Sequence, residues 1–318
     1  MDYHVAWYNL ENLFDTVRSN NRPDWLQKKL NKELKGWTAP VLDKKLNQLS
    51  TVINGMNQGA GPDILGVCEI ENDDVLSKLI TKLHLQRNYA VAHHDMSDKR
   101  GIDVAFIYDQ DLLSVTHQFS RVILKRNATR DIFQVNFQTD AGNTLICIGN
   151  HWPSRSGGQA ASEPYRQMAG ETLSYWVERI KAITGPDTPV IVLGDFNDEP
   201  FDSSLADYAL GERSPKKVIS KRSKKPYLMN LMWEMMGQGH GTHYYDNWGM
   251  LDQILVNKPL LNKEGPFKLV KDSVAIIKTP QMLKSGKPRR FNRPSAKKGV
   301  DEAGYSDHLP IEVRVRED

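Results

Sequence analysis

One stretch, residues 188–200, constrains the fold of this chain more than any other. An uninterrupted aliphatic run at 190–193 is followed by Gly194, Asp195 and, two residues later, Asn197. An aliphatic run without polar alternation predicts a strand that is buried on both faces. Gly194 permits a sharp turn or the close approach of a ligand, so the polar groups would stand at the strand's carboxyl end. Open α/β sheets bind ligands there, although a strand followed by an Asx turn explains this stretch equally well.

The same pattern, an apolar strand that opens into polar residues, recurs along the chain. Strands alternate with amphipathic helices in places and follow one another directly in others, without a linker. We therefore expect one α/β domain of packed sheets with outer helices, spanning residues 1–318. The polar residues at the predicted strand ends are Asn9, Glu69, Asp103, Asn150, His151, Asp195, Asn197, Asp252, Asp307 and His308.

The segment before the second predicted strand carries no such polar group. Pro23 and Pro40 interrupt residues 16–41, so this segment is expected to be irregular. From Asp43 onward, apolar residues at three- and four-residue spacings predict an amphipathic helix that covers a sheet.

The residue types at the strand ends favour one kind of chemistry. A single histidine or carboxylate there is more often structural than catalytic, but a recurring set is not readily produced by turn formation alone. Carboxylates without cysteine ligands select a hard cation such as Mg²⁺ or Mn²⁺. A histidine oriented by a carboxylate transfers protons near neutral pH. Metal-assisted hydrolysis of a phosphoester is therefore the reaction class that the set predicts.

Composition excludes little. The 42 lysines and arginines exceed the 39 acidic residues by three, too few to indicate a polyanionic partner from net charge. Cys68 and Cys147 lie in apolar runs and indicate no disulfide framework. The chain lacks an apolar stretch of about 18 residues, and a strand follows Met1 almost directly. We expect a cytoplasmic monomer without a membrane span or a stable protein partner, unless a signal peptide was removed.

The polar motifs resemble those of the endonuclease/exonuclease/phosphatase superfamily, which has the deoxyribonuclease-I-like fold. Each motif is short, but seven occur in the superfamily's order. The opening, residues 7–15, is similar to that of a bacterial branch of predicted nucleases. The resemblance implies a four-layered α-β-β-α sandwich, in which helices flank two facing mixed sheets. The motifs are Asn9, Cys68-Glu69, Arg100-Gly101-Ile102-Asp103, Asn150-His151-Trp152, Gly194-Asp195-Phe196-Asn197, Leu251-Asp252-Gln253-Ile254 and Ser306-Asp307-His308.

The resemblance also implies a metal site. Glu69 would be the principal ligand of Mg²⁺, with Mn²⁺ as an alternative ion. Asn9 would lie beside Glu69, and Asp307 would contribute directly or through water.

The remaining motif residues would act on the substrate. The resemblance implies that Asp195 orients or deprotonates the attacking water and that Asn197 holds the scissile phosphate. His308, steered by Asp252, and His151 would flank that phosphate as proton-transfer groups.

One assignment comes from the residues themselves. Asp103 lies among apolar neighbours, where a carboxylate is costly unless it is paired or hydrogen-bonded. We interpret Asp103 as the carboxylate partner of His151, and so as part of the catalytic group.

The substrate is less sharply indicated than the reaction. Two basic segments, 216–225 and 287–298, offer contacts to a nucleic-acid backbone, although each is also compatible with an ordinary solvated surface. Asn150, Arg155 and Arg290 are predicted to contact substrate phosphates. We find no aromatic hairpin of the kind that a lipid-cleaving relative would expose.

Three functions are therefore ranked. A nuclease acting on DNA or RNA comes first. A phosphatase or phosphodiesterase acting on a small or lipid-headgroup phosphoester, of the inositol-phosphate or sphingomyelin type, comes second. A binding protein without catalysis comes third, because every expected catalytic position is filled.

Overall fold

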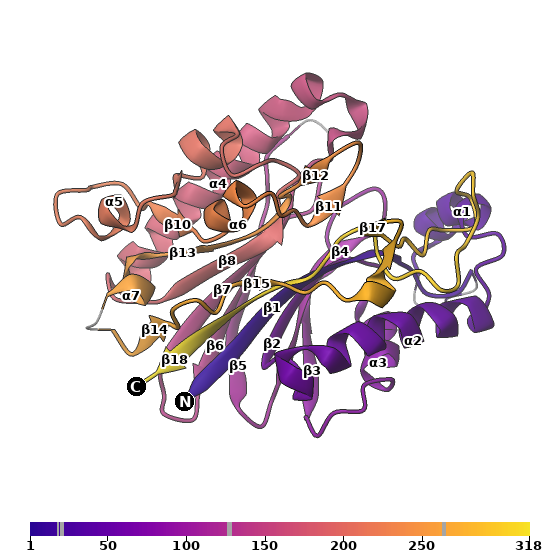
Figure 1. Ribbon diagram of the computed structural model, residues 1–318, viewed down its shortest axis with the longest axis horizontal. Coiled ribbons are helices and arrows are strands. Elements are labelled where there is room, and N and C mark those ends of the chain that lie inside the picture. Colours follow the sequence, from indigo (N-terminus) through magenta and orange to yellow (C-terminus); the bar gives the residue numbers. More distant parts are fainter. Residues whose placement is uncertain (18, 20–21, 126–128, 263–264) are drawn as a thin grey trace.

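Two large β-sheets form the centre of the molecule, as the computed structural model in Figure 1 shows. The structure describes residues 1–17, 19, 22–125, 129–262 and 265–318.

The first sheet has the strand order β14-β18-β1-β2-β4-β3, with β15 paired to β18. β1 runs parallel to β2 and antiparallel to β18, so the two ends of the chain lie side by side (Figure 1). The strands are β1 (Asp2–Leu13), β2 (Ile64–Ile70), β3 (Tyr89–His93), β4 (Asp103–Asp109), β14 (Phe267–Leu269), β15 (Ala275–Ile276) and β18 (Ile311–Glu317).

The second sheet has the order β5-β6-β7-β8-β13-β10-β9. β7 and β8 are parallel, whereas β8 and β13 are antiparallel. Its strands are β5 (Leu113–Arg121), β6 (Ile132–Thr139), β7 (Thr144–His151), β8 (Val190–Asp195), β9 (Gly211–Glu212), β10 (Leu228–Asn230) and β13 (Asp252–Val256). Two small hairpins pair β11 (His243–Tyr244) with β12 (Trp248–Gly249), and β16 (Leu283–Lys284) with β17 (Lys287–Pro288).

Helices cover the outer faces of the two sheets (Figure 1). α2 and α3 lie against the first sheet, and the long α4 lies against the second. Among the described residues, no helix is long and apolar enough to cross a bilayer. The helices are α1 (Asp24–Glu33), α2 (Ala39–Gly55), α3 (Asp73–Ile80), α4 (Gln159–Thr184), α5 (Pro215–Ile219), α6 (Trp233–Gly237) and α7 (Lys258–Leu261), with one-turn helices at Asn57–Gly59, Arg155–Gly157, Ser204–Tyr208 and Pro280–Met282.

Three apolar clusters separate four layers. Along β1, Ala6 and Tyr8 belong to the cluster under the helices of the first sheet, whereas Val5 and Trp7 belong to the cluster between the sheets. A third cluster packs the second sheet against α4. Because each sheet is buried on both faces, its strands read as continuous apolar runs. The predicted four-layered sandwich of two mixed sheets flanked by helices is confirmed.

The expectation that residues 16–41 are irregular is wrong. α1 lies within this segment and buries Leu26 and Leu30. α2 begins at Ala39, four residues before Asp43, where the helix is predicted to begin, and Pro40 stands in its first turn. A proline is tolerated there because the first helical N–H groups have no intrahelical acceptor. Residues 18, 20 and 21 lie outside the described part of this segment.

Strand register places three polar residues in one row. His151 at the end of β7 stands opposite Asp195 of β8, and Asp195 stands opposite Asp252 of β13. In the first sheet, the register between β2 and β4 shifts at Glu69, whose φ of 61° is in the left-handed region. A bulge re-aims a side chain, and here it lies at the strand end that carries the predicted metal ligand.

We expect Gly194→Ala to destabilise the fold. An added Cβ would lie 2.6 Å from the Cβ of Asn150 and 2.7 Å from its carbonyl oxygen. Overpacking of this kind costs about 1 to 3 kcal/mol, measurable as a lower urea midpoint. Gly55→Ala is the control, because nothing lies within 4 Å of its added Cβ. Equal midpoints for Gly194→Ala and wild type would contradict the close contact between β7 and β8.

Candidate active site

The two sheets meet at His151. Its Nε2 lies 3.6 Å from Oε1 of Glu69, in the first sheet, and 3.8 Å from Oδ2 of Asp195, in the second. These distances exceed those of hydrogen bonds, so the groups converge without bonding directly. Burial, together with the positive charges of Arg130 and Arg100, lowers the pKa of His151 well below its ordinary value. His151 is therefore neutral near pH 7.

His308 is in the opposite protonation state. Its Nδ1 lies 2.6 Å from Oδ2 of Asp252, and its Nε2 lies 3.8 Å from Oδ2 of Asp195. Burial alone would lower the pKa of His308, but the negative charges of Asp252 and Asp195 raise it well above 6.5. Trp7 fixes the pair, because its Nε1 donates to Oδ1 of Asp252 at 3.2 Å. A cationic and a neutral histidine thus flank the same carboxylate.

Asp195 is that shared carboxylate. It accepts hydrogen bonds from Nδ2 of Asn9 at 3.1 Å and from the backbone N–H of Asn197 at 3.0 Å. Burial raises the pKa of Asp195 to about 7; the charge of His308 opposes this rise, and the Asp252 carboxylate adds to it. A carboxylate with this pKa can exchange a proton near neutral pH.

The residues around Glu69 suit a hard divalent cation. Oε2 of Glu69 accepts the backbone N–H of Asn12 at 2.9 Å, and across the described ranges no lysine or arginine forms an ion pair with this carboxylate. Nδ1 of His151 is buried and has no hydrogen-bond partner in the described structure. A carboxylate that has no lysine or arginine partner in the described residues can offer its oxygens to Mg²⁺, which prefers oxygen ligands.

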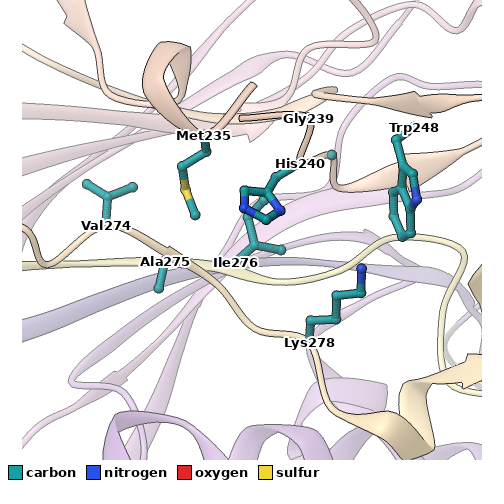
Figure 2. A pocket seen from close by; sticks show the side chains of 9 residues that line it. Met235, Gly239, His240, Trp248, Val274, Ala275, Ile276 and Lys278 are labelled. Carbon is teal, nitrogen blue, oxygen red and sulfur yellow. The ribbon is translucent and has the colours of Figure 1, made fainter. Parts of the chain in front are cut away.

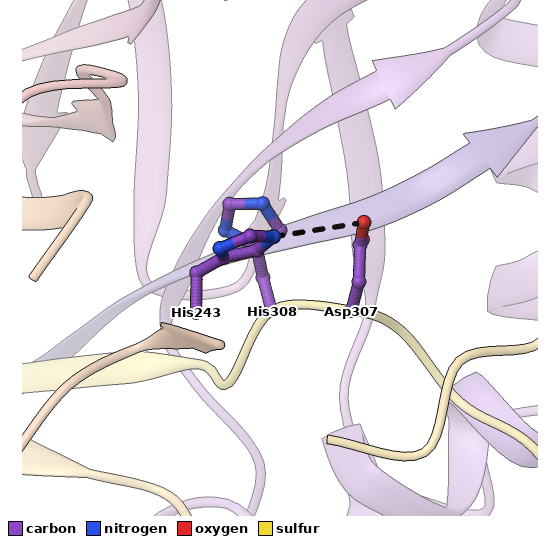
Figure 3. A group of neighbouring side chains, drawn as sticks. All are labelled: His243, Asp307 and His308. Atoms are coloured by element: carbon purple, nitrogen blue, oxygen red, sulfur yellow. Dashed lines mark ion pairs between the residues drawn. The ribbon is translucent and has the colours of Figure 1, made fainter. Parts of the chain in front are cut away.

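Asp307 lies beside His308 and contacts two further side chains, those of Arg290 and His243. Oδ2 of Asp307 is 2.9 Å from Nη2 of Arg290 and 4.0 Å from Nε2 of His243 (Figure 3). The ring of His243 lies 4.6 Å from that of His308, and the two backbones form an isolated antiparallel bridge. Burial and the charge of His308 lower the pKa of His243 to about 4, so this histidine is neutral.

A sequence model of the "Endonuclease/Exonuclease/phosphatase family" matches residues 4–317. The chain belongs to this family. The resemblance seen in the motifs is confirmed. The family match also supports the prediction that the protein is a phosphoester hydrolase. Members of this family typically depend on a divalent metal. No curated protein matches the chain significantly.

Solved structures with the same fold cover almost the whole chain. The endonuclease/exonuclease/phosphatase of Bacteroides vulgatus is 16% identical, with 100% of both chains covered and a TM-score of 0.60. TDP2 of D. rerio, complexed with a single-strand DNA product, is 14% identical, with 99% of both chains covered and a TM-score of 0.59. The mannosyl-6-phosphatase Bt3783 of Bacteroides thetaiotaomicron is 16% identical, with 99% of both chains covered and a TM-score of 0.56. At these identities, the likeness concerns the fold.

Most of the predicted family residues lie together. The row of His151, Asp195 and Asp252 belongs to the second sheet. It lies next to Glu69, a predicted metal ligand on the first sheet, and next to His308 of the Ser-Asp-His motif before β18. The residues that it places in this group are Asn9, Glu69, His151, Asp195, Asn197, Asp252, Asp307 and His308.

The predicted pairing of Asp103 with His151 is wrong. Oδ2 of Asp103 lies 3.0 Å from Nε2 of His93, and Oδ1 accepts the backbone N–H of Met96. The reason is strand order. Asp103 begins β4, whose neighbour at the sheet edge is β3 with His93 at its end, whereas His151 belongs to the other sheet.

Of the predicted phosphate contacts, the structure contradicts Asn150 and places Arg155 in ion pairs. Asn150 is fully buried: its Nδ2 donates to backbone carbonyls, and its Oδ1 accepts from Nε1 of Trp152. Successive strand residues face opposite ways, so Asn150 points away from the site that His151 enters. Arg155 forms ion pairs with Asp198 and Asp202, and its Nε donates to the carbonyl of Asn197. Asn150 therefore holds β7 against β8, whereas Arg155 joins the loops that follow these two strands.

Several site residues escaped the sequence analysis. Lys45 occupies an apolar position of α2 and reaches the site fully buried. A lysine on the apolar face of a predicted helix was the signal in the sequence that could have identified it. Glu11 is buried two residues after Asn9, where the backbone has a positive φ of 48° and the strand register shifts, so the alternation of side chains along the strand did not indicate its position. His243 has no such local signal, because only strand pairing brings it to His308.

An aromatic hairpin is present, contrary to expectation. β11 and β12 carry Tyr244 and Trp248, and Tyr245 at the turn is 79% exposed. Nζ of Lys287 lies over the ring of Tyr244, and Nζ of Lys278 lies over that of Trp248. The hairpin was missed because its strands are two residues long and carry no alternating pattern.

We expect Asp252→Asn to lower the pKa of His308, because one of the negative charges that opposes its burial is lost. Titration of imidazole NMR signals between about pH 6 and pH 8 measures this, with the exposed His84 as internal control. A raised histidine pKa stabilises the fold below about pH 6.5, and that stability is lost as the pH rises through the folded value. In the variant, this loss moves to lower pH. An unchanged titration of His308 would refute the role of Asp252.

We expect Asp103→Asn to change the pH dependence of stability and not that of activity. Burial raises the pKa of Asp103 from 3.8 to about 6, with the His93 hydrogen bond opposing. Wild type should therefore lose up to about 3 kcal/mol relative to the variant as the pH rises from about 4 to 6. Urea unfolding at several pH values measures this, with the exposed Asp140→Asn as control. A changed pH profile of activity would restore the pairing with His151.

Proposed function

We propose that this protein is a Mg²⁺-dependent phosphodiesterase that hydrolyses nucleic acid, either DNA or RNA. The observation that carries the proposal is the convergence on Asp195 of a cationic His308 and a neutral His151, next to the unpaired carboxylate of Glu69. This arrangement supplies a proton acceptor, hydrogen-bond donors and a cation site around one position.

The chain's own residues would divide the work as follows. Asp195, held by Asn9 and with a pKa of about 7, accepts the proton of the attacking water. Protonated His308 donates to a phosphate oxygen and stabilises its developing charge, while Asp252 keeps the ring oriented. A divalent cation held by Glu69, with Asn9 and Asp307 nearby, would polarise the phosphoryl oxygen and stabilise the leaving group.

Asn197 and His151 would position the phosphate. Asn197 adopts a left-handed backbone conformation, with φ 53°, and its Nδ2 donates to the carbonyl of Trp152. This fixes the amide next to Asp195. His151 is neutral and can donate or accept one hydrogen bond at the same phosphate.

Nucleic acid is favoured as the substrate by the surface beside His308. Two aromatic rings of the β11–β12 hairpin lie against lysine ammonium groups from later segments, Lys278 at 4.5 Å from the centre of Trp248 and Lys287 at 4.2 Å from that of Tyr244. Aromatic faces stack on bases and cations contact phosphates, which is the combination that single-stranded nucleic acid requires. Arg290 adds a half-exposed guanidinium at the same rim.

A second candidate is a phosphatase or phosphodiesterase acting on a small phosphoester. A cavity of about 330 Å³ lies beside the hairpin, with Trp248 and Lys278 towards one end and Met235 and Val274 towards the other (Figure 2). This volume suits a sugar or a single nucleotide, which would lie next to the site, because the lining of the cavity includes none of the proposed catalytic residues. The similar mannosyl-6-phosphatase fold is compatible with such a substrate.

The test is cleavage of supercoiled plasmid DNA and of single-stranded RNA with Mg²⁺ or EDTA. We expect Mg²⁺-dependent cleavage that falls at least about 100-fold in His308→Ala, since a proton-transfer group is lost. His84→Ala, which removes an exposed histidine outside the site, is the matched control.

Small substrates separate the two candidates. Intact plasmid and RNA with hydrolysis of bis-p-nitrophenyl phosphate or p-nitrophenyl phosphate by wild type alone would overturn the nuclease assignment and favour the second candidate. Cleavage that persists in EDTA would contradict the metal requirement.

A further inference from the structure

Arg290 lies between two carboxylates at the edge of the active site. Its Nε lies 2.9 Å from Oε1 of Glu11, and its Nη2 lies 2.9 Å from Oδ2 of Asp307. Glu11 is only 1% exposed, whereas the side chain of Arg290 is 52% exposed. A guanidinium from the rim loop thus reaches inward and joins two acidic groups from opposite ends of the chain.

The Glu11 carboxylate is already well stabilised in this arrangement. Oε2 accepts the backbone N–H of Phe291 at 2.9 Å, and Nζ of Lys45 lies 3.9 Å away. Lys45 is itself fixed, because its Nζ donates to the carbonyl of Tyr305 at 2.7 Å. Glu11 and Asp307 therefore face two basic side chains, Lys45 and Arg290, which balance their charges within the chain.

Glu69 differs from this pair. Throughout the described residues, neither a lysine nor an arginine is ion-paired with it, although its negative charge acts on both Lys45 and Arg290. The demand for an external cation is therefore concentrated at Glu69. Glu11 and Asp307, in contrast, direct carboxylate oxygens at one positive centre, the guanidinium of Arg290. A hard cation would otherwise bind such a set of oxygens.

We propose that the guanidinium of Arg290 takes the place of a divalent cation between Glu11 and Asp307. This inference rests on the proposed metal-dependent function. The guanidinium presents two donors in a fixed plane, which suits two separate carboxylates. Because it is tethered to the chain, it competes with free ions at a high effective concentration. The protein then binds one divalent ion, at Glu69, to which Asp307 contributes through water, and the position between Glu11 and Asp307 stays closed.

Neutralising Arg290 should open the second position. We expect Arg290→Gln to bind one Mn²⁺ more per chain than wild type, counted by the loss of the EPR signal of free Mn²⁺. Arg290→Lys keeps the positive charge and should bind the same number as wild type. Arg293→Gln is the matched control: it makes the same change in the same loop, but Arg293 pairs with Glu33. An unchanged number of ions in Arg290→Gln would overturn the proposal.

A measurement on wild type covers the case in which Arg290→Gln does not fold, which circular dichroism would reveal. The ¹⁵N-labelled Nε–H of Arg290 should keep its shift and slow exchange when Mg²⁺ is added to saturation, because its bond to Glu11 persists. If Mg²⁺ addition changes the shift of this Nε–H and speeds its exchange with water, the ion displaces Arg290 from Glu11, and the proposal is overturned.

Neither measurement contains substrate. A failure of the proposed nuclease function, seen as intact nucleic acid, therefore leaves both readouts interpretable. A failure of this inference likewise leaves the cleavage assays unaffected.

Discussion

The active site depends on the register of three neighbouring strands. Parallel pairing of β7 with β8 and antiparallel pairing of β8 with β13 align His151, Asp195 and Asp252 in one row. A slip of one residue would turn each side chain to the opposite face. Burial prevents that slip, because Ile191 faces the other sheet and Val192 faces α4, so neither face of β8 tolerates the reverse pattern.

The distance between the sheets matters as much as the register. Trp7 and Asn9 of the first sheet donate to Asp252 and Asp195 of the second. These bonds cross the interior at the level of the site, above the apolar cluster that joins the sheets. The catalytic geometry is therefore a property of sheet packing, and the rim loops can differ between relatives without altering it.

The sequence predicted the layers and named most of the residues that the structure brings together, because both leave local patterns. Buried strands read as aliphatic runs, and polar groups at strand ends are visible beside them. Partner choice leaves no such pattern. Asp103 required a partner, but whether His93 or His151 supplied it depended on which strands are neighbours. The ion pairs of Arg155 were hidden for the same reason, whereas the start of α2 was missed because Pro40 was read as a breaker.

The pairing of β1 with β18 has a consequence for the timing of synthesis. Ser306 donates its hydroxyl to the carbonyl of Asn9, a residue 297 positions earlier, and β18 lies directly beside β1. While the chain is still emerging from the ribosome, β1 has one unpaired edge and the site lacks Asp307 and His308. Contacts of such long sequence separation form late and slowly. The nascent protein therefore cannot assemble the candidate site, or hydrolyse a phosphoester there, until the last strand has been made and docked.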